Sequence, residues 1–187
     1  MPPAALIIID MQKGMALPEA GVRNNPGAED RIFDLLGHWR AKSGVVVHVR
    51  HISRTQGSPF WPGQPGVEFQ PRLAPLDDEA VFEKSVPCAF TGSALERWLR
   101  ARDIDELVIV GVSTNNSVEA SARSAGNLGF KTFVVSDGTF AFAKPDFNGV
   151  ERSAEEVHAM SLANLQGEYA SVISAAEARC LPTRARP

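Results

Sequence analysis

The chain has 187 residues, 44% of them hydrophobic and 22% charged, and its formal net charge is −3 at pH 7. This length and composition predict one globular domain over residues 1–187. No basic block is present, which argues against a nucleic acid or an anionic membrane as a partner. The apolar N-terminal run is too short for a signal or a membrane span, and the two cysteines lack a CxxC spacing. We therefore expect a cytoplasmic protein.

Short β-branched runs alternate with longer amphipathic segments, which is typical of βαβ units built on a parallel sheet. The first strand is expected over residues 5–9 and the second over 45–49. Between them, apolar residues at spacings of three and four predict a helix over 28–42. Residues 53–76 form a long connection rich in Pro and Gly. A connection of this length inside a compact domain usually has a function.

The second half of the chain repeats the alternation. A helix is expected to begin near residue 91, and the tail from residue 181 is expected to be frayed. The predicted strands, of which the last lies at a sheet edge, cover residues 81–84, 106–110, 131–136 and 172–173.

Two further helices carry capping signals. Thr114 or Asn115 is expected to cap a helix that runs through residue 128 and is closed by Gly129. Ser153, with Glu156 three residues later, predicts a capping box for a helix that reaches about residue 166.

Three polar groups follow predicted strands, namely Asp10, Lys84 and the segment 111–117. In an open parallel sheet, ligands bind outside the carboxyl ends of the strands. Each group alone has an ordinary structural explanation, as a turn residue, a solvated lysine or a tight turn with a helix cap. The helix that follows 111–117 nevertheless offers free N–H groups and a positive dipole end to a developing oxyanion. Only the combination of the three predicts a site.

A resemblance to a known family rests on three stretches that occur in order, ALIIIDMQKGM, FEKSVPCAFTGSALERWLRARDIDELVIVGVSTNNSVEASARSAGNLGF and EVHAMSLANLQGEYA. Along most of its length the sequence resembles the isochorismatase-like hydrolases, the cysteine hydrolase family. The resemblance implies a three-layer αβα fold with a mostly parallel, Rossmann-like sheet of about six strands.

The family performs acyl transfer with a triad of Asp, Lys and Cys. By resemblance, the Asp falls on Asp10, the Lys on Lys84 and the nucleophile position on Ser117, where this chain has a serine in place of the usual cysteine. The resemblance also implies a cis peptide between Val112 and Ser113. This bond would aim the Ser113 N–H, beside the Ser117 N–H, at a substrate oxygen.

The serine leaves three accounts of the mechanism open. An aliphatic hydroxyl starts at a much higher pKa than a thiol, so a carboxylate base activates it far less. In the first account, Ser117 is a natural residue of an enzyme without a covalent intermediate, as in family members that cleave a vinyl ether. In the second, it is a slow serine nucleophile. The third account is an engineered, inactivated form of a cysteine enzyme. Cys88 lies four residues after Lys84 and is expected to be a packed core thiol.

The substrate-binding candidates come from the strand ends and the long connection. Gln12 is expected to orient the carboxylate or the substrate, and Phe60 and Trp61 to wall the pocket, although both aromatic rings suit packing over the sheet edge equally well. Arg50 and Arg54 are candidates to hold a substrate carboxylate, since arginine binds carboxylates in bidentate geometry.

We expect no metal and no other cofactor. Nicotinamidase-type relatives bind a metal after the second strand through an Asp and two His, and HVRHISRTQGSPFWPGQPG lacks that arrangement. His48 is expected in the core and His51 at the pocket. His38 and His158 are expected on helix surfaces or in packing contacts.

These features predict hydrolysis of a small amide, imide, carbamoyl or vinyl-ether substrate. One rival is a catalytically silent homologue that only binds a small molecule. The other, a dinucleotide-dependent enzyme, lacks a GxGxxG after the first strand. By resemblance to the family, the chain is expected to form a homodimer or homotetramer.

Overall fold

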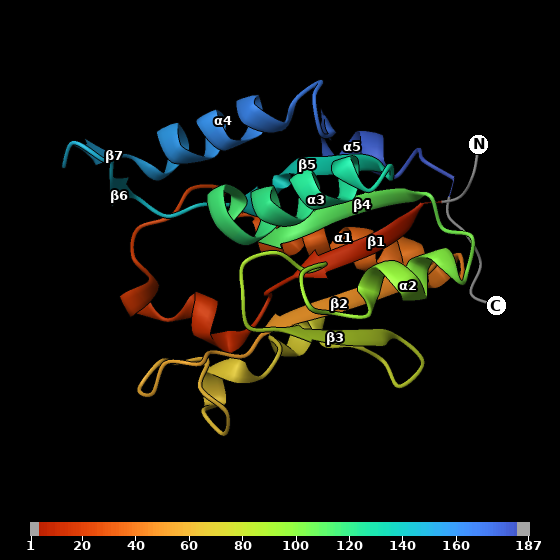
Figure 1. The fold of residues 1–187 in the computed structure, drawn as a ribbon, viewed down its shortest axis with the longest axis horizontal. Coiled ribbons are helices and arrows are strands. Elements are labelled where there is room, and N and C mark those ends of the chain that lie inside the picture. Colours follow the sequence, from red (N-terminus) through yellow and green to blue (C-terminus); the bar gives the residue numbers. More distant parts are fainter. Residues whose placement is uncertain (1–3, 183–187) are drawn as a thin grey trace.

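The structure is a computed structural model that describes residues 4–182, so most of the tail expected to be frayed lies outside the described residues. Its main sheet has six parallel strands in the order β3-β2-β1-β4-β5-β8 (Figure 1). The strands are β1 (Ala5–Ile9), β2 (Val46–His51), β3 (Ala80–Lys84), β4 (Glu106–Val112), β5 (Lys131–Phe140) and β8 (Ser171–Ile173). The predicted edge position of the last strand is confirmed.

Helices cover both faces of this sheet. One apolar cluster packs α1 (Ala28–Ala41) and α5 (Ala175–Ala178) on one face, and a second cluster packs the other helices on the opposite face. These other helices are α2 (Leu95–Arg100), α3 (Glu119–Asn127) and α4 (Ala154–Leu165). The predicted three-layer α/β fold is therefore confirmed.

The local patterns explain why these elements form. All five residues of β1 are buried, as the central strand of a parallel sheet requires. The predicted inner face of α1 is fully buried, and Trp39 Nε1 donates a hydrogen bond to the Ala4 carbonyl at 3.0 Å. The capping box of α4 is present, because the Ser153 side chain accepts from the Glu156 N–H and Glu156 accepts from the Ser153 N–H.

The predicted cap of the helix after β4 is wrong. Ser113 occupies the N-cap position, and its side chain makes no capping hydrogen bond. The first turn, η5 (Thr114–Val118), is π-helical because the Val118 N–H reaches back five residues to the Ser113 carbonyl. The Thr114 hydroxyl instead contacts His158, which lies on α4.

Several boundaries also differ from the sequence-based expectation. β4 and β5 run further than expected, and their register shifts between Ile109 and Gly111. α2 begins later, after a series of turns. A small antiparallel hairpin, β6 (Lys144–Pro145) with β7 (Glu151–Arg152), was not expected, because two-residue strands carry no periodicity. The remaining elements are short 3-10 turns, η1 (Lys13–Ala16), η2 (Pro18–Ala20), η3 (Pro65–Val67) and η4 (Pro71–Leu73).

The sheet topology determines where a site forms. The chain builds β1, β2 and β3 toward one edge and then returns to place β4 on the other side of β1. The strand order therefore reverses between β1 and β4, and a ligand site is expected outside their carboxyl ends. Among residues 4–182, no helix is long and apolar enough to cross a membrane.

Gly111 should be indispensable to this arrangement. It has a φ of +119°, and an added Cβ would lie 2.1 Å from the Ile9 carbonyl oxygen on β1. We expect Gly111→Ala to lower the free energy of unfolding by more than about 3 kcal/mol, because backbone atoms on both strands must move. Gly129→Ala is the matched control, since Gly129 also has a positive φ but open space around it, and should cost about 1 kcal/mol. Urea unfolding measures both, and equal losses would contradict the expectation.

Candidate active site

Asp10 follows the central strand and is almost fully buried. Its N–H donates to the Val49 carbonyl at 2.8 Å, which joins the end of β1 to β2. Its φ of +54° lies in the left-handed region, which few residues other than glycine adopt. The strand therefore ends abruptly at this carboxylate.

Lys84 ends the edge strand β3, but its side chain is buried rather than solvated. Its Nζ donates to Asp10 Oδ2 at 2.6 Å and to Ser117 Oγ at 3.2 Å. One buried ammonium thus joins a carboxylate and a hydroxyl that come from distant parts of the chain.

Ser117 lies in the π-helical turn η5 directly after β4, and it is buried. Its carbonyl accepts a hydrogen bond from Ser121 Oγ at 2.6 Å, and the same hydroxyl of Ser121 accepts the Ala89 N–H at 2.9 Å. The peptide bond between Val112 and Ser113, just before this turn, is cis, as the family resemblance implied. The turn is therefore tied to the segment after β3, which begins directly after Lys84.

The electrostatics of the site favour a carboxylate that can accept a proton. Burial raises the pKa of Asp10 above its ordinary value, and the Lys84 ammonium opposes this shift. Asp10 Oδ1 has no hydrogen-bond partner among the described residues, although it is buried. Burial and the Lys84 charge both lower the pKa of His51, which is half-buried beside the pair, so its imidazole is neutral at neutral pH.

Residues 4–177 match the family model described as the isochorismatase domain. The chain belongs to the isochorismatase family. A crystal structure described as a putative hydrolase of the isochorismatase family from Chromobacterium violaceum superimposes with a TM-score of 0.93 at 48% identity, covering 95% of this chain and 92% of that one. The isochorismatase family protein YrdC of Bacillus subtilis is 37% identical over 91% of each chain. Maleamate amidohydrolase of Pseudomonas putida is 31% identical over 70% of this chain and 69% of its own length.

Members of the isochorismatase family are hydrolases, and amidohydrolases such as nicotinamidase and maleamate amidohydrolase are among them. The chain is therefore an isochorismatase-family hydrolase. The comparisons establish this class and the fold, and the substrate is a separate question.

Of the predicted substrate-binding residues, Gln12 lies in the interior, whereas Phe60 and Trp61 lie in the loop after β2. The Gln12 amide donates to the His51 and Val67 carbonyls, both at 2.9 Å, and accepts the His51 N–H at 2.7 Å. Gln12 is fully buried, so its amide orients the end of β2 rather than facing a cavity. Phe60 stands edge-on to His51 with ring centroids 6.0 Å apart, and Trp61 lies half-buried in the same loop.

The two arginine candidates also differ in their surroundings. Arg50 forms an ion pair with Glu83, so its guanidinium is already occupied by a carboxylate of the chain. Arg54 is exposed and lines a cavity of about 320 Å³ whose wall includes Lys84 and Thr91. A second cavity, of about 380 Å³, lies at the turn before Ser117. Its lining residues are Ser113, Asn115, Asn116, Phe142 and Lys144.

The side chains around β2 do not fit a metal site. His48 is fully buried in the core and contacts Glu79 at 2.9 Å, and Glu79 also accepts two hydrogen bonds from Arg40. Although burial opposes it, these hydrogen bonds hold the pKa of Glu79 well below its usual range. Across residues 4–182, no three His, Cys, Asp or Glu side chains gather as metal ligands.

Cys88 is not the packed core thiol that was expected. It is half-buried, and its Sγ donates to Ser124 Oγ at 3.0 Å. Burial opposes the shift, but this hydrogen bond and others lower the pKa of Cys88. His38 is a half-buried helix residue that packs on Trp39, as expected.

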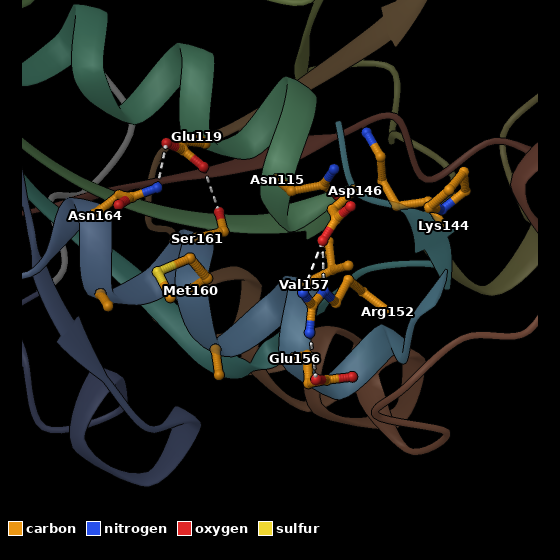
Figure 2. A pocket seen from close by; sticks show the side chains of 13 residues that line it. Asn115, Glu119, Lys144, Asp146, Arg152, Glu156, Val157, Met160, Ser161 and Asn164 are labelled. Atoms are coloured by element: carbon orange, nitrogen blue, oxygen red, sulfur yellow. Dashed lines mark hydrogen bonds and ion pairs between the residues drawn. The ribbon is translucent and has the colours of Figure 1, made fainter. Parts of the chain in front are cut away.

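Sequence reasoning missed the contribution of α4 to the site. His158 and Ser161, three residues apart on its buried face, hydrogen-bond to the turn that carries Ser117. Figure 2 shows this face of α4 opposite that turn, with Ser161 bonded to Glu119. Two polar residues on the buried face of α4, beside Ala154 and Leu165, were the available signal, because buried polar groups require partners.

Removing the Lys84 ammonium should destabilise the protein in a pH-dependent way. Lys84→Met leaves the Asp10 carboxylate buried without its partner, and breaking such a pair costs about 3–5 kcal/mol. The pKa of Asp10 is already raised by burial and should rise further. A carboxyl whose pKa is higher in the folded state than in the unfolded state binds more protons when folded. The free energy of unfolding therefore falls as the pH rises from the unfolded pKa to the folded pKa. The loss should therefore be larger at pH 8 than at pH 5.

Urea unfolding at the two pH values measures this difference. The double variant Asp10→Asn/Lys84→Met should recover most of the loss, because it removes both charges. Lys13→Met, at an exposed ion pair with Glu68, is the control and should change little at either pH. An equal loss at pH 5 and pH 8 would exclude the ion-pair explanation.

Proposed function

We propose that the chain hydrolyses a small amide, or a related imide, carbamoyl or vinyl-ether compound, at the cluster of Asp10, Lys84 and Ser117. The observation that supports this most strongly is the single buried ammonium bonded to both a carboxylate and a hydroxyl at the carboxyl ends of three strands. The amidohydrolases among the relatives support an amide as the substrate class.

In this proposal Asp10 is the general base for an amide, imide or carbamoyl substrate, whereas for a vinyl ether its protonated form is the general acid and water adds to the cation that results. Oδ2 is held by Lys84, whereas Oδ1 has free lone pairs and receives the proton of the attacking group. The raised pKa of Asp10 brings its basicity closer to what proton transfer near neutral pH requires. The Ser113 and Ser117 N–H groups at the start of the helix stabilise the oxyanion that develops on the substrate.

Two routes are consistent with this arrangement. In the covalent route, Ser117 Oγ attacks the carbonyl carbon, its proton passes through Asp10 to the leaving amine, and water then hydrolyses the acyl ester. In the direct route, Asp10 deprotonates a water molecule that attacks the carbonyl, and Ser117 only orients the substrate. A carboxylate base activates a hydroxyl poorly, which favours the direct route.

Substitutions distinguish these routes. We expect Asp10→Asn to reduce kcat/KM about 10³-fold in either route, since it removes the base. Ser117→Ala should cost as much in the covalent route but less than about tenfold in the direct route. The assay is release of ammonia or acid from nicotinamide, maleamate, an N-carbamoyl amino acid and a vinyl ether such as isochorismate.

Asp30→Asn, at an exposed ion pair with Arg72, is the matched control and should retain full activity. A further variant, Ser117→Cys, tests whether the serine inactivates the site. Turnover by this variant but not by the parent would identify an inactivated cysteine enzyme. Tight binding without turnover in the parent and in Ser117→Cys would refute hydrolysis and leave a binding protein.

The proposal extends to self-association of this hydrolase. Three large apolar side chains are exposed beside one groove: Phe147 at 98% and Val150 at 51% on the β6–β7 hairpin, and Met160 at 65% on α4. The groove, of about 790 Å³, lies between that hairpin, α4 and the start of α3 (Figure 2). An exposed apolar projection next to a groove on one face suits a two-fold pairing of identical copies.

Light scattering coupled to gel filtration measures the association. We expect the parent to be a dimer or tetramer. Phe147→Asp should raise the dissociation constant of the dimer at least about tenfold, since a charge replaces a ring that the pairing would bury. Leu76→Asp, which is also exposed but precedes β3, is the control and should not change the mass. A parent protein that is monomeric at micromolar concentration would refute the pairing.

A further inference from the structure

The turn that carries Ser117 is held from one side by α4. Thr114 Oγ1 and His158 Nδ1 are 2.8 Å apart, and both side chains are buried. Ser161 Oγ, one helical turn later, donates to the Thr114 carbonyl at 2.9 Å and also contacts Glu119 Oε2 at 2.7 Å. Thr114 is thus bound through its hydroxyl and its carbonyl by two residues of one helix.

His158 is itself anchored to the sheet. Its Nε2 lies 3.4 Å from Asn25 Nδ2, and Asn25 donates to the Ser136 and Thr139 carbonyls at 2.9 and 2.7 Å. Burial lowers the pKa of His158, although Glu155 and the Ser136 carbonyl oppose the shift. The imidazole is therefore neutral at neutral pH and acts as a fixed hydrogen-bonding group rather than as a charge.

The position of Thr114 makes these contacts relevant to the site. Thr114 is the first residue of the π-helical turn, it follows Ser113 directly, and it precedes Ser117 by three residues. The Ser113 carbonyl accepts the Asn116 and Val118 N–H groups, so hydrogen bonds join residues 113–118 into one turn. Its orientation determines how Ser117 Oγ meets Lys84 Nζ, and errors well below 1 Å matter for such geometry.

We infer that His158 and Thr114 form a latch that positions residue 117 and the N–H groups of its turn. They are positioning residues, because neither contacts Asp10 or Lys84 through a hydrogen bond in the described structure. The catalytic consequence rests on the proposed function. The geometric consequence, a defined environment for the side chain at 117, does not depend on turnover.

A thiol introduced at position 117 reports this environment without any substrate. In the Ser117→Cys background, the rate of alkylation by iodoacetamide against pH gives the pKa and the reactivity of that thiol. Peptide mass spectrometry follows the introduced thiol and Cys88 separately, so Cys88 serves as an internal reference. Because alkylation of the thiol by iodoacetamide requires no hydrolysis, the experiment remains informative if the chain hydrolyses none of the compounds tried.

We expect Thr114→Val, which keeps the shape but removes the hydroxyl, to lower the alkylation rate of the introduced thiol at pH 7 by about tenfold, equivalent to about one pKa unit. Thr114→Ser keeps the hydroxyl and should stay within about twofold of the background. His158→Leu and His158→Asn form a second pair, for use should Thr114→Val fold poorly. We expect His158→Leu to lower the alkylation rate of the introduced thiol and His158→Asn to retain it.

Thr132→Val is the control for stability. Thr132 is also buried in β5 and donates to the Phe130 carbonyl at 3.1 Å, but it lies at the other end of the sheet. It should destabilise the fold without changing the alkylation of the introduced thiol. The latch is refuted if Thr114→Val and His158→Leu fold but leave the rate within about twofold of the background, or if Thr132→Val lowers it equally. Loss of alkylation together with no turnover in any variant would instead refute the proposed function and retain the latch.

Discussion

The ion pair between Asp10 and Lys84 is the interaction around which the rest of the site is arranged. Both side chains are almost completely removed from water, and removing each charge from water costs several kcal/mol. The contact of 2.6 Å and the second hydrogen bond to Ser117 offset part of this cost. A buried pair of this kind is weak evidence for stability, so its placement at the strand ends is better explained by chemistry than by folding.

The sheet order explains why the cation needs a long side chain. β2 lies between β3 and β1, so Lys84 reaches across two strand spacings, about 10 Å, to meet Asp10. The end of β2 must therefore leave room for this side chain. Gln12 performs that task by binding the His51 backbone on both its N–H and its carbonyl, which fixes the strand end beside the lysine. On the other side of β1, Gly111 allows β4 to approach closely, because any side chain at this position would collide with the β1 backbone.

Two independent segments support the hydroxyl that completes the cluster. Ser121 links the Ser117 carbonyl to the backbone at Ala89, downstream of Lys84, and α4 binds the turn through His158 and Ser161. The Lys84 carbonyl accepts the Ile52 N–H and the Asp10 N–H donates to the Val49 carbonyl, so each of the three residues is held by backbone contacts of its own. A thiol next to a lysine and a helix start ionises easily, whereas a serine hydroxyl gains much less, so in the proposed mechanism the serine leaves more of the activation to Asp10.

Local signals in the chain were enough to predict most of the strands and helices. The alternation of apolar runs predicted the strands and layers, and the family motifs located the carboxylate, the lysine, the hydroxyl and the cis peptide on three short stretches. Such features depend on neighbours within a few residues or on a motif that stays contiguous. This is why the strands and helices were predicted at the right places in the chain, even where their first or last residues were not.

Which polar groups meet depends on contacts between segments that are far apart in the chain. Gln12 binds residues 39 and 55 positions away, and Thr114 binds a histidine 44 positions away. Nothing near Thr114 in sequence distinguishes a hydroxyl that caps its own helix from one that bonds another helix, and the predicted cap was wrong for that reason. A hydrogen bond depends on distances of about 3 Å between groups, and the packing of α4 on the sheet, not the local chain, sets those distances.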